Sequence, residues 1–397
     1  MSVSVSSLSF GFLAVGIWFA SAMSAGMVVT LIVLARGWMK EPSSAGPQHI
    51  HLGSTSRLGG VGVFAGFVIA VAFALQLEFI PLRPALSLLI AALPVHAAGL
   101  LEDITHRVSP TNRLLAAVFS AVLASAIAQG VVTRLDLPFV DAWLNYLPFA
   151  ILLSCFMVVG ACNAFNIIDG TNGLAGGTAV LIFVGMAIVA GGAGDTLVLA
   201  QALAMTGALV GFLLWNFPRG KVFLGDAGAY FIGFMYAQLS IQLVTRNAGV
   251  SAWFVIALSA YPIFETLFSI YRRKVLRHAA AMQPDIQHLH SLLYLQLLRS
   301  AQRPPLEERR RNLADVGYRG RERRKQPQRR ANARVAPHLW LHGALCLVIA
   351  LLYHDNTPIL ICFTLIYGVL YWICYRHAER LSSEIAMARL LPPSAGD

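Results

Sequence analysis

The fold is decided by residues 174–215, LAGGTAVLIFVGMAIVAGGAGDTLVLAQALAMTGALVGFLLW, in which two apolar runs are separated by a short glycine-rich turn. Asp195, in the turn, is the only charged residue of this stretch. Each run is close to the roughly 20 residues that an α-helix needs to cross the hydrocarbon core of a bilayer. Because the bilayer core offers no water to unpaired backbone groups, these runs predict a pair of antiparallel transmembrane helices.

The same pattern continues along the whole chain. Of the 397 residues, 57% are hydrophobic and only 12% are charged, about half the charged fraction of a soluble domain. The sequence therefore predicts an all-α, polytopic membrane protein with about eleven transmembrane helices, and a single domain that spans residues 1–397. The predicted spans are 10–35, 59–78, 84–101, 114–133, 143–163, 174–191, 196–215, 226–243, 251–271, 338–353 and 357–375.

The formal net charge of +11 is unevenly distributed along the chain. With a periplasmic N-terminus and a cytoplasmic C-terminus, 27 of the 30 Lys and Arg residues fall in cytoplasmic segments, and only Arg83, Arg134 and Arg246 lie outside. This asymmetry follows the positive-inside rule and predicts a multi-pass protein of the cell inner (cytoplasmic) membrane. The basic stretch 299–337 is predicted to be a disordered cytoplasmic loop or to lie against anionic headgroups. Nucleic-acid binding is the less favoured interpretation of this stretch.

Polar residues gather in five clusters where predicted helices meet the cytoplasm. In SRLGG, residues 56–60, Arg57 precedes two glycines that allow the backbone to approach an anion closely. Glu102 and Asp103 follow each other at a helix C-terminus, where neither the helix dipole nor the neighbouring charge favours a carboxylate. A cation or a proton-transfer role would offset that cost, whereas the structural alternative is a solvated loop.

The third cluster, NAFNIIDGTNG, combines amides, one acid and glycines. Amide side chains both donate and accept hydrogen bonds, and glycines admit a ligand, so the cluster suits a nucleotide and a metal. A structural turn would explain the glycines but not three asparagines around one aspartate. The polar residues of this cluster are Asn163, Asn166, Asp169 and Asn172.

The last two clusters add an acid, a lysine and two histidines. Asp226 lies between glycines at a helix start, shortly after Lys221, where it is either an ordinary helix cap or an open ligand for Mg²⁺. His288 and His290 form a His-x-His pair that suits a metal or a pyrophosphate, although loop histidines usually bind neither. On one membrane face, acids for Mg²⁺ and cationic groups for phosphates predict phosphoryl transfer between a water-soluble and a lipid substrate.

The chain resembles the polyprenyl-phosphate N-acetylhexosamine-1-phosphate transferase family, the undecaprenyl-phosphate GlcNAc-1-phosphate transferase-like enzymes of glycosyltransferase family 4. The motifs NAFNIIDGTNGLAGG, FLGDAGAYFIGF and PDIQHLHSLL carry the resemblance, which covers nearly all of the eleven predicted spans. The family includes enzymes that initiate the synthesis of O-antigen, enterobacterial common antigen and teichoic acid.

This resemblance implies transfer of an N-acetylhexosamine-1-phosphate from a UDP-sugar to undecaprenyl phosphate, with release of UMP, in a site that faces the cytoplasm. It implies Mg²⁺, or Mn²⁺ in its place, as the cofactor. It assigns Asp226 and Asp169 to the metal, and Asp103, Glu102 and Asp226 to catalysis. The residues implied in substrate binding are Arg57, Asn163, Asn166, Asn172, Lys221, His288 and His290.

The chain departs from the family pattern at four places. Glu102 and Glu265 replace aspartates and keep the charge, whereas Asn172 replaces an aspartate and Ser291 replaces the last histidine of its loop. The donor sugar stays open, as does the oligomeric state, a homodimer included. Two other functions stay open beside the transferase: an ion-coupled secondary transporter, and a catalytically inactive member of the family.

Overall fold

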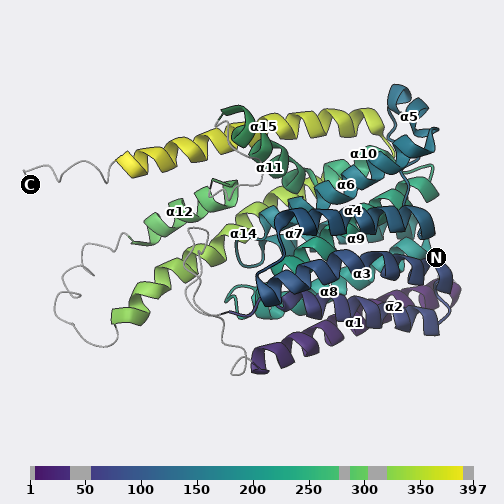
Figure 1. Cartoon of the computed structure of the whole chain (residues 1–397), viewed down its shortest axis with the longest axis horizontal. Helices are drawn as coiled ribbons and strands as arrows, with labels where there is room; N and C mark the ends of the chain where they lie inside the picture. Colours follow the sequence, from purple (N-terminus) through teal and green to yellow (C-terminus); the bar gives the residue numbers. More distant parts are fainter. Residues whose placement is uncertain (1–4, 36–54, 277–286, 303–319, 388–397) are drawn as a thin grey trace, which may run out of the picture.

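The computed structural model describes residues 5–35, 55–276, 287–302 and 320–387 (Figure 1). Within these ranges the regular structure is helical, and no strand occurs. The long helices are α1 (Val5–Leu34), α2 (Gly59–Gln76), α3 (Leu82–Thr105), α4 (Pro110–Ile127), α6 (Leu147–Ile168), α7 (Leu174–Gly192), α8 (Thr196–Asn216), α9 (Gly225–Arg246), α14 (Gly320–Leu352) and α15 (Thr357–Met387). The shorter helices are α5 (Pro138–Leu144), α10 (Ala252–Leu258), α11 (Ala260–Tyr271), the π-helical turn η2 (Arg272–Leu276) and α12 (Leu289–Gln302).

Ten of the described helices are long and apolar enough to cross a membrane. They are the ten long helices, and each corresponds to one of the eleven predicted spans. The prediction of an all-α, multi-pass membrane protein is therefore confirmed. The remaining predicted span, 251–271, is the one that differs in the structure.

The span predicted over 251–271 is broken in the structure. The structure divides this segment into α10 and α11, which meet at Ser259 with a bend of 76°. Pro262 explains the position of the break, because it has no N–H to donate to the carbonyl of Leu258 in a continuous helix. The bend directs α11 away from the axis of α10 and against α6 and α15.

The structure also differs from the predicted disordered loop 299–337. Residues 299–302 end α12, and residues 320–337 form the first half of α14; residues 303–319 lie outside the described residues. Ala331, Val335 and Leu339 are buried and recur at intervals of one helical turn. Packing of this apolar face against α12 and α7 therefore overrides the basic, proline-containing composition from which disorder was predicted.

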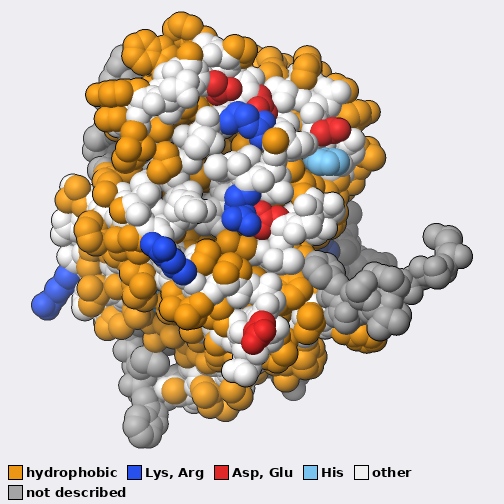
Figure 2. Space-filling model, turned by 90° about the vertical axis from the view of Figure 1, so that its right-hand side faces the viewer, with side chains coloured by type: hydrophobic (Ala, Val, Ile, Leu, Met, Phe, Trp, Pro, Cys, Tyr) orange, Lys and Arg blue, Asp and Glu red, His pale blue; other side chains and the backbone are white. Residues whose placement is uncertain are grey.

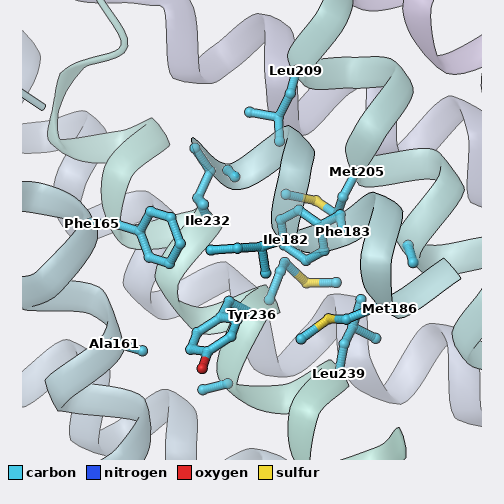
Figure 3. Close-up of a cluster of buried hydrophobic side chains, with 14 of the residues drawn as sticks. Ala161, Phe165, Ile182, Phe183, Met186, Met205, Leu209, Ile232, Tyr236 and Leu239 are labelled. Carbon is cyan, nitrogen blue, oxygen red and sulfur yellow. The ribbon is translucent and has the colours of Figure 1, made fainter. Parts of the chain in front are cut away.

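Helix α9 occupies the centre of the bundle. Among the ten candidate spans of the described chain it is the least apolar, and the only one whose spanning segment is wholly buried by protein. It packs on α2, α3 and α6. Figure 3 shows how apolar side chains of α6, α7, α8 and α9 meet in this core, among them Phe165, Ile182, Phe183, Met205, Leu209 and Ile232.

Small residues let three helices approach one another at the start of α9. A Cβ on Gly60 of α2 would clash with the backbone of Gly228, and a Cβ on Gly99 of α3 would clash with the backbone of Ala227. Small residues at such crossings allow the backbones of membrane helices to come close together. The first turn of α9 therefore lies directly beside the start of α2 and the last turns of α3.

The other end of the bundle, where α5 lies, carries few charged side chains (Figure 2). Asp195 caps α8 through the N–H of Val198 and pairs with Arg246 at the end of α9, with an Nε–Oδ2 distance of 2.7 Å. Arg134 pairs with Asp136 in the segment that precedes α5, and its guanidinium also donates to the Val244 carbonyl of α9. These contacts hold the end of α9 away from the predicted functional clusters.

Candidate active site

Asp103 holds the first turn of α9 from a neighbouring helix. It lies in the last turn of α3, and its carboxylate oxygens accept hydrogen bonds from the backbone N–H groups of Asp226 (2.9 Å) and Ala227 (2.8 Å). These N–H groups have no partner within α9, and the positive end of the helix dipole favours a carboxylate there. Asp103 therefore fixes the direction in which Asp226 presents its own side chain.

The carboxylate of Asp226 is engaged by two donors. Asn166 Nδ2 donates to Oδ1 at 2.8 Å, and the guanidinium of Arg113 donates to Oδ2. Asn166 comes from the last turn of α6 and Arg113 from the first turn of α4. Together with Asp103 on α3, the ends of four helices thus meet at one carboxylate.

Arg57 is brought to the acids by a short stretch of backbone pairing. Hydrogen bonds of 2.8–2.9 Å join residues 56–60 to residues 223–224. Gly225, the next residue, has a φ of +74°, and a Cβ there would overlap the carbonyl oxygen of Arg57 and the carboxylate of Asp103. Only glycine adopts this conformation readily and leaves room for both neighbours.

Asp169 forms the C-cap of α6, just beyond the membrane-spanning segment, and lies within electrostatic reach of Arg57. Burial raises the pKa of Asp169 to about 8, and the charge of Arg57 opposes this rise only in part. This carboxyl group therefore keeps its proton to a higher pH than a solvated aspartate does. A cation that binds its carboxylate would compete with that proton.

Two histidines at the start of α12, His288 and His290, lie beside the segment that follows α6. His290 packs against Gly170, where a Cβ would clash with the imidazole ring, and His288 stacks on His290 with 5.4 Å between the ring centroids. His288 Nδ1 lies 2.9 Å from Glu265 Oε1. Burial, together with the charge of His288, lowers the pKa of His290 to about 4, so this imidazole is neutral at physiological pH.

The acids meet part of what a divalent cation requires. Asp169 and Asp226 supply carboxylate oxygens, which are ligands that Mg²⁺ prefers. Within the described ranges, however, no group of three or more acidic, His or Cys side chains could hold a cation by itself. Mg²⁺ is commonly bound through one or two carboxylates together with substrate phosphates. The residues therefore fit a cation that shares its coordination with a phosphate ligand.

An apolar groove runs along α6 toward the end of the helix that carries Asn166 and Asp169. It has a volume of about 940 Å³ and lies between α4, α6 and α11. Its α6 lining runs from Leu147 to Ile167, almost the full length of that helix, and ends two residues before Asp169. Its polar lining includes Asn163 and Arg273. Such a groove suits a long apolar chain that carries a charged headgroup.

Comparison with known proteins finds a family that part of the chain resembles. The sequence model of glycosyl transferase family 4 matches residues 85–244, which include Asp103, Asp169 and Asp226. Over these residues the chain is similar to glycosyl transferase family 4.

Several family relatives have curated names. A "probable undecaprenyl-phosphate N-acetylglucosaminyl 1-phosphate transferase" of Bacillus subtilis (strain 168) is 28% identical over 269 residues, 67% of this chain and 72% of the relative. The undecaprenyl-phosphate alpha-N-acetylglucosaminyl 1-phosphate transferase of Yersinia pestis is 31% identical over 252 residues, 61% of this chain and 66% of the relative. The decaprenyl-phosphate N-acetylglucosaminephosphotransferase of Mycobacterium leprae (strain TN) is 29% identical over 271 residues, which are 62% of this chain and 68% of the relative. The chain thus matches about two thirds of each relative's length, and the names indicate a sugar-phosphate transferase.

Three of the residues predicted to bind a substrate have contacts with groups other than the three aspartates. The Asn163 amide donates to a carbonyl of its own helix at 2.8 Å, and the Asn172 amide donates to the Pro218 carbonyl at 3.1 Å. The Lys221 ammonium lies 4.6 Å from the centroid of the Trp215 ring. Their roles toward a substrate stay predictions.

The two adjacent acids of α3 have different contacts. Glu102 accepts a hydrogen bond from the N–H of Val108 at 2.8 Å and so closes the turn after α3, whereas Asp103 points to α9. The catalytic roles predicted for both residues also stay predictions. The contacts show that each of them additionally stabilises a local backbone conformation.

Sequence reasoning missed two residues that the structure places at this candidate site. Arg113 stands in the same polar cluster as Arg107, and nothing in the sequence distinguishes the two; in the structure Arg107 is exposed and Arg113 reaches Asp226. Glu265 was noted as a replaced aspartate but not placed in the site. A buried carboxylate in an otherwise apolar segment was the available signal, because such a group needs a partner; His288 is that partner.

Proposed function

We propose that this chain transfers an N-acetylhexosamine-1-phosphate from a UDP-sugar to undecaprenyl phosphate. The observation that carries the proposal is the meeting of three aspartates and two arginines at the end of an apolar groove. Such a site accommodates a charged, water-soluble donor and the headgroup of a lipid acceptor side by side. The relatives named above for undecaprenyl and decaprenyl phosphate support the same acceptor class.

In the proposed reaction, an oxygen of the acceptor phosphate attacks the sugar-side phosphorus of the donor diphosphate. A new P–O bond forms to that phosphorus, the bond to the bridging oxygen breaks, and its electron pair leaves with UMP. Catalysis of such a transfer depends on positioning and on balancing charge. Arg57 and Arg113 lie where they can balance charge on the phosphates, and Asn166 orients Asp226.

Mg²⁺, with Mn²⁺ as an alternative, would be held by Asp226 and Asp169 and would neutralise charge on the diphosphate when bound. Asp103 is proposed to orient or deprotonate the acceptor phosphate with Glu102, in addition to holding α9. His288 and His290 would lie near the diphosphate, the latter as a neutral imidazole.

The proposal includes a location and a pathway. The excess of Lys and Arg in alternate connections supports an inner-membrane protein whose active site faces the cytoplasm. The product, undecaprenyl-diphosphate-sugar, would initiate the synthesis of a cell-surface polysaccharide. N-acetylglucosamine appears in the names of the relatives and is the first donor sugar to test.

The test uses the purified full chain in detergent, with Mg²⁺, undecaprenyl phosphate and a panel of UDP-sugars, and follows the release of UMP. We expect release that depends on both the lipid and the metal ion, and the best donor names the sugar. Folded protein that releases no UMP with any sugar of the panel would contradict the proposal.

The groove offers a separate test of the lipid acceptor. Gly160 lines the groove, and a Cβ there meets no atom within 4 Å, so Gly160→Leu places its side chain in the groove without a clash. Leucine is also the better helix former. We expect the KM for undecaprenyl phosphate to rise about tenfold, a loss of about 1.4 kcal/mol of binding, while the KM for the UDP-sugar stays unchanged.

Gly192→Leu is the matched control, because Gly192 also has open space around its Cβ position and lies at the far end of α7. The control is expected to leave both KM values as in the unsubstituted protein. A Gly160→Leu variant with an unchanged KM for the lipid would remove the acceptor from this groove.

Glu265 is expected to act through His288. Its buried carboxylate contacts His288 Nδ1 at 2.9 Å and accepts from the Tyr371 hydroxyl at 2.7 Å. Glu265→Gln keeps the shape but removes the charge that orients the imidazole, and we expect kcat to fall about 10- to 100-fold, as for other carboxylates that orient functional histidines.

Tyr371→Phe removes a different hydrogen bond to the same carboxylate and leaves His288 its partner. We therefore expect this variant to keep most of its kcat, and Glu265→Asp to recover part of the rate lost in Glu265→Gln. Equal losses in Tyr371→Phe and Glu265→Gln would instead assign the whole cluster to packing. Initial rates of UMP release over a range of both substrates separate kcat from KM.

A further inference from the structure

The Asp226 carboxylate, which the proposed function assigns to a cation, is already paired with the guanidinium of Arg113. Arg113 donates to Oδ2 while Asn166 donates to Oδ1, so both oxygens of Asp226 already face a hydrogen-bond donor. The side chains of the pair are only 14% and 11% exposed. The guanidinium is further held 5.8 Å from the centroid of the Tyr230 ring, one turn along α9.

This arrangement is unfavourable for a free divalent cation. A cation needs the carboxylate lone pairs that the guanidinium and the amide now use. The cation would also have to displace the Arg113 guanidinium or bind next to it. Because both side chains are mostly buried, solvent ions would screen the repulsion between the two positive charges only poorly. Within the described parts of the chain no three-ligand group of acidic, His or Cys side chains offers the cation another position.

A diphosphate changes this balance. It brings oxygen ligands for the cation, and it offers the guanidinium a second anion, for which the planar, multi-donor Arg side chain is well suited. Arg113 sits in the first turn of α4, at the end where Arg57 and the three aspartates gather. Its side chain therefore lies on the border between Asp226 and the place of the donor.

We propose that Arg113 is an internal counter-ion that closes the Asp226 site to free divalent cations, so that cation and diphosphate bind as one unit. This inference rests on the proposed function and adds the order of binding to it. Because such coupling is reciprocal, the diphosphate raises the affinity for the cation by the same factor as the cation raises the affinity for the diphosphate.

The test measures Mn²⁺ binding directly, from the electron paramagnetic resonance signal of free Mn²⁺ in titrations of the full-length protein in detergent. Titrations are made without nucleotide and with UDP, whose own chelation of Mn²⁺ is measured separately. We expect the unsubstituted protein to bind Mn²⁺ at least tenfold more tightly when UDP is present. Arg113→Met, which keeps the length but removes the charge, is expected to bind Mn²⁺ without UDP at least tenfold more tightly than the unsubstituted protein.

Two further variants sharpen the result. Arg113→Lys keeps a positive charge and is expected to stay close to the unsubstituted protein without UDP. Adding Asp226→Asn to Arg113→Met is expected to abolish the gain, which assigns the new Mn²⁺ affinity to that carboxylate. If Arg113→Met does not fold, the comparison of the unsubstituted protein with and without UDP still tests the inference, because an unchanged Mn²⁺ affinity overturns it.

The inference is overturned if Arg113→Met binds Mn²⁺ no more tightly than the unsubstituted protein, or if UDP leaves the Mn²⁺ affinity of the unsubstituted protein unchanged. Release of UMP by the unsubstituted protein separates these results from the proposed function. With UMP released and no effect of Arg113→Met, only the counter-ion role fails. Without UMP release for any sugar, the transferase proposal fails, whatever the Mn²⁺ titrations show.

Discussion

Asp226→Asn is expected to reduce the release of UMP about 100- to 1,000-fold, the size of loss seen when one group that stabilises developing charge is removed. The amide keeps the shape of the side chain but loses the charge that Arg113 and the proposed cation require. Its N–H₂ group would also face a second donor, either the Arg113 guanidinium or the Asn166 amide. Initial rates at saturating lipid and UDP-sugar measure the effect.

The chain offers a matched control for the stability effect of this change. Asp195 is likewise a mostly buried aspartate at a helix start, and it pairs with Arg246 and Asn247 as Asp226 pairs with Arg113 and Asn166. Asp195→Asn therefore breaks a comparable ion pair at the other end of the bundle. We expect it to lower the thermal unfolding midpoint while UMP release is retained. Comparable losses of activity in the two variants would contradict a specific role for Asp226.

Gly225→Ala is expected to abolish activity and to destabilise the fold. The methyl group would overlap the carbonyl oxygen of Arg57 and the carboxylate of Asp103, at a backbone φ of +74°. The positive φ costs about 1–2 kcal/mol for a residue with a Cβ, and forcing a methyl group into a packed place adds about 1–3 kcal/mol. Displacement of Asp103 would also release the start of α9, and with it the Asp226 carboxylate.

Gly194→Ala separates the two contributions. Gly194 has nearly the same φ, +72°, but no atom lies within 4 Å of the position of its Cβ. This variant is expected to lose only the backbone contribution of about 1–2 kcal/mol and to keep its activity. Thermal unfolding and UMP release on both variants test the prediction, which fails if Gly225→Ala behaves like Gly194→Ala.

The membrane spans could be predicted from the sequence because their signal is local. A run of apolar residues such as 174–191 is recognisable without knowledge of its neighbours, and α7 begins and ends within one residue of it. The break at Ser259 was missed because Pro262 can also occur in a kinked but continuous span, and only packing of α11 against other helices decides between them.

The clusters of the site could also be predicted, but their contacts could not. The motif around Asp226 predicts an acid at a helix start. Nothing nearby in the sequence indicates that Asp103, 123 residues away, caps that helix. Arg113 and Glu265 were missed for the same reason. Each of the two contacts a partner elsewhere in the fold, Arg113 with Asp226 and Glu265 with His288. Such contacts depend on tertiary packing rather than on spacing along one segment.

The burial of α9 has a consequence for how the protein is made. As the least apolar of the ten candidate spans, α9 is the one that lipid alone would accept least readily, and its polar side chains, Gln238 and Gln242 among them, are surrounded by protein in the finished bundle. The spans synthesised before it, α2, α3 and α6 in particular, form the surroundings into which it inserts. Biogenesis of the active centre is thus tied to the order of synthesis: the helix that carries Asp226 enters the membrane after the partners that hold it in place.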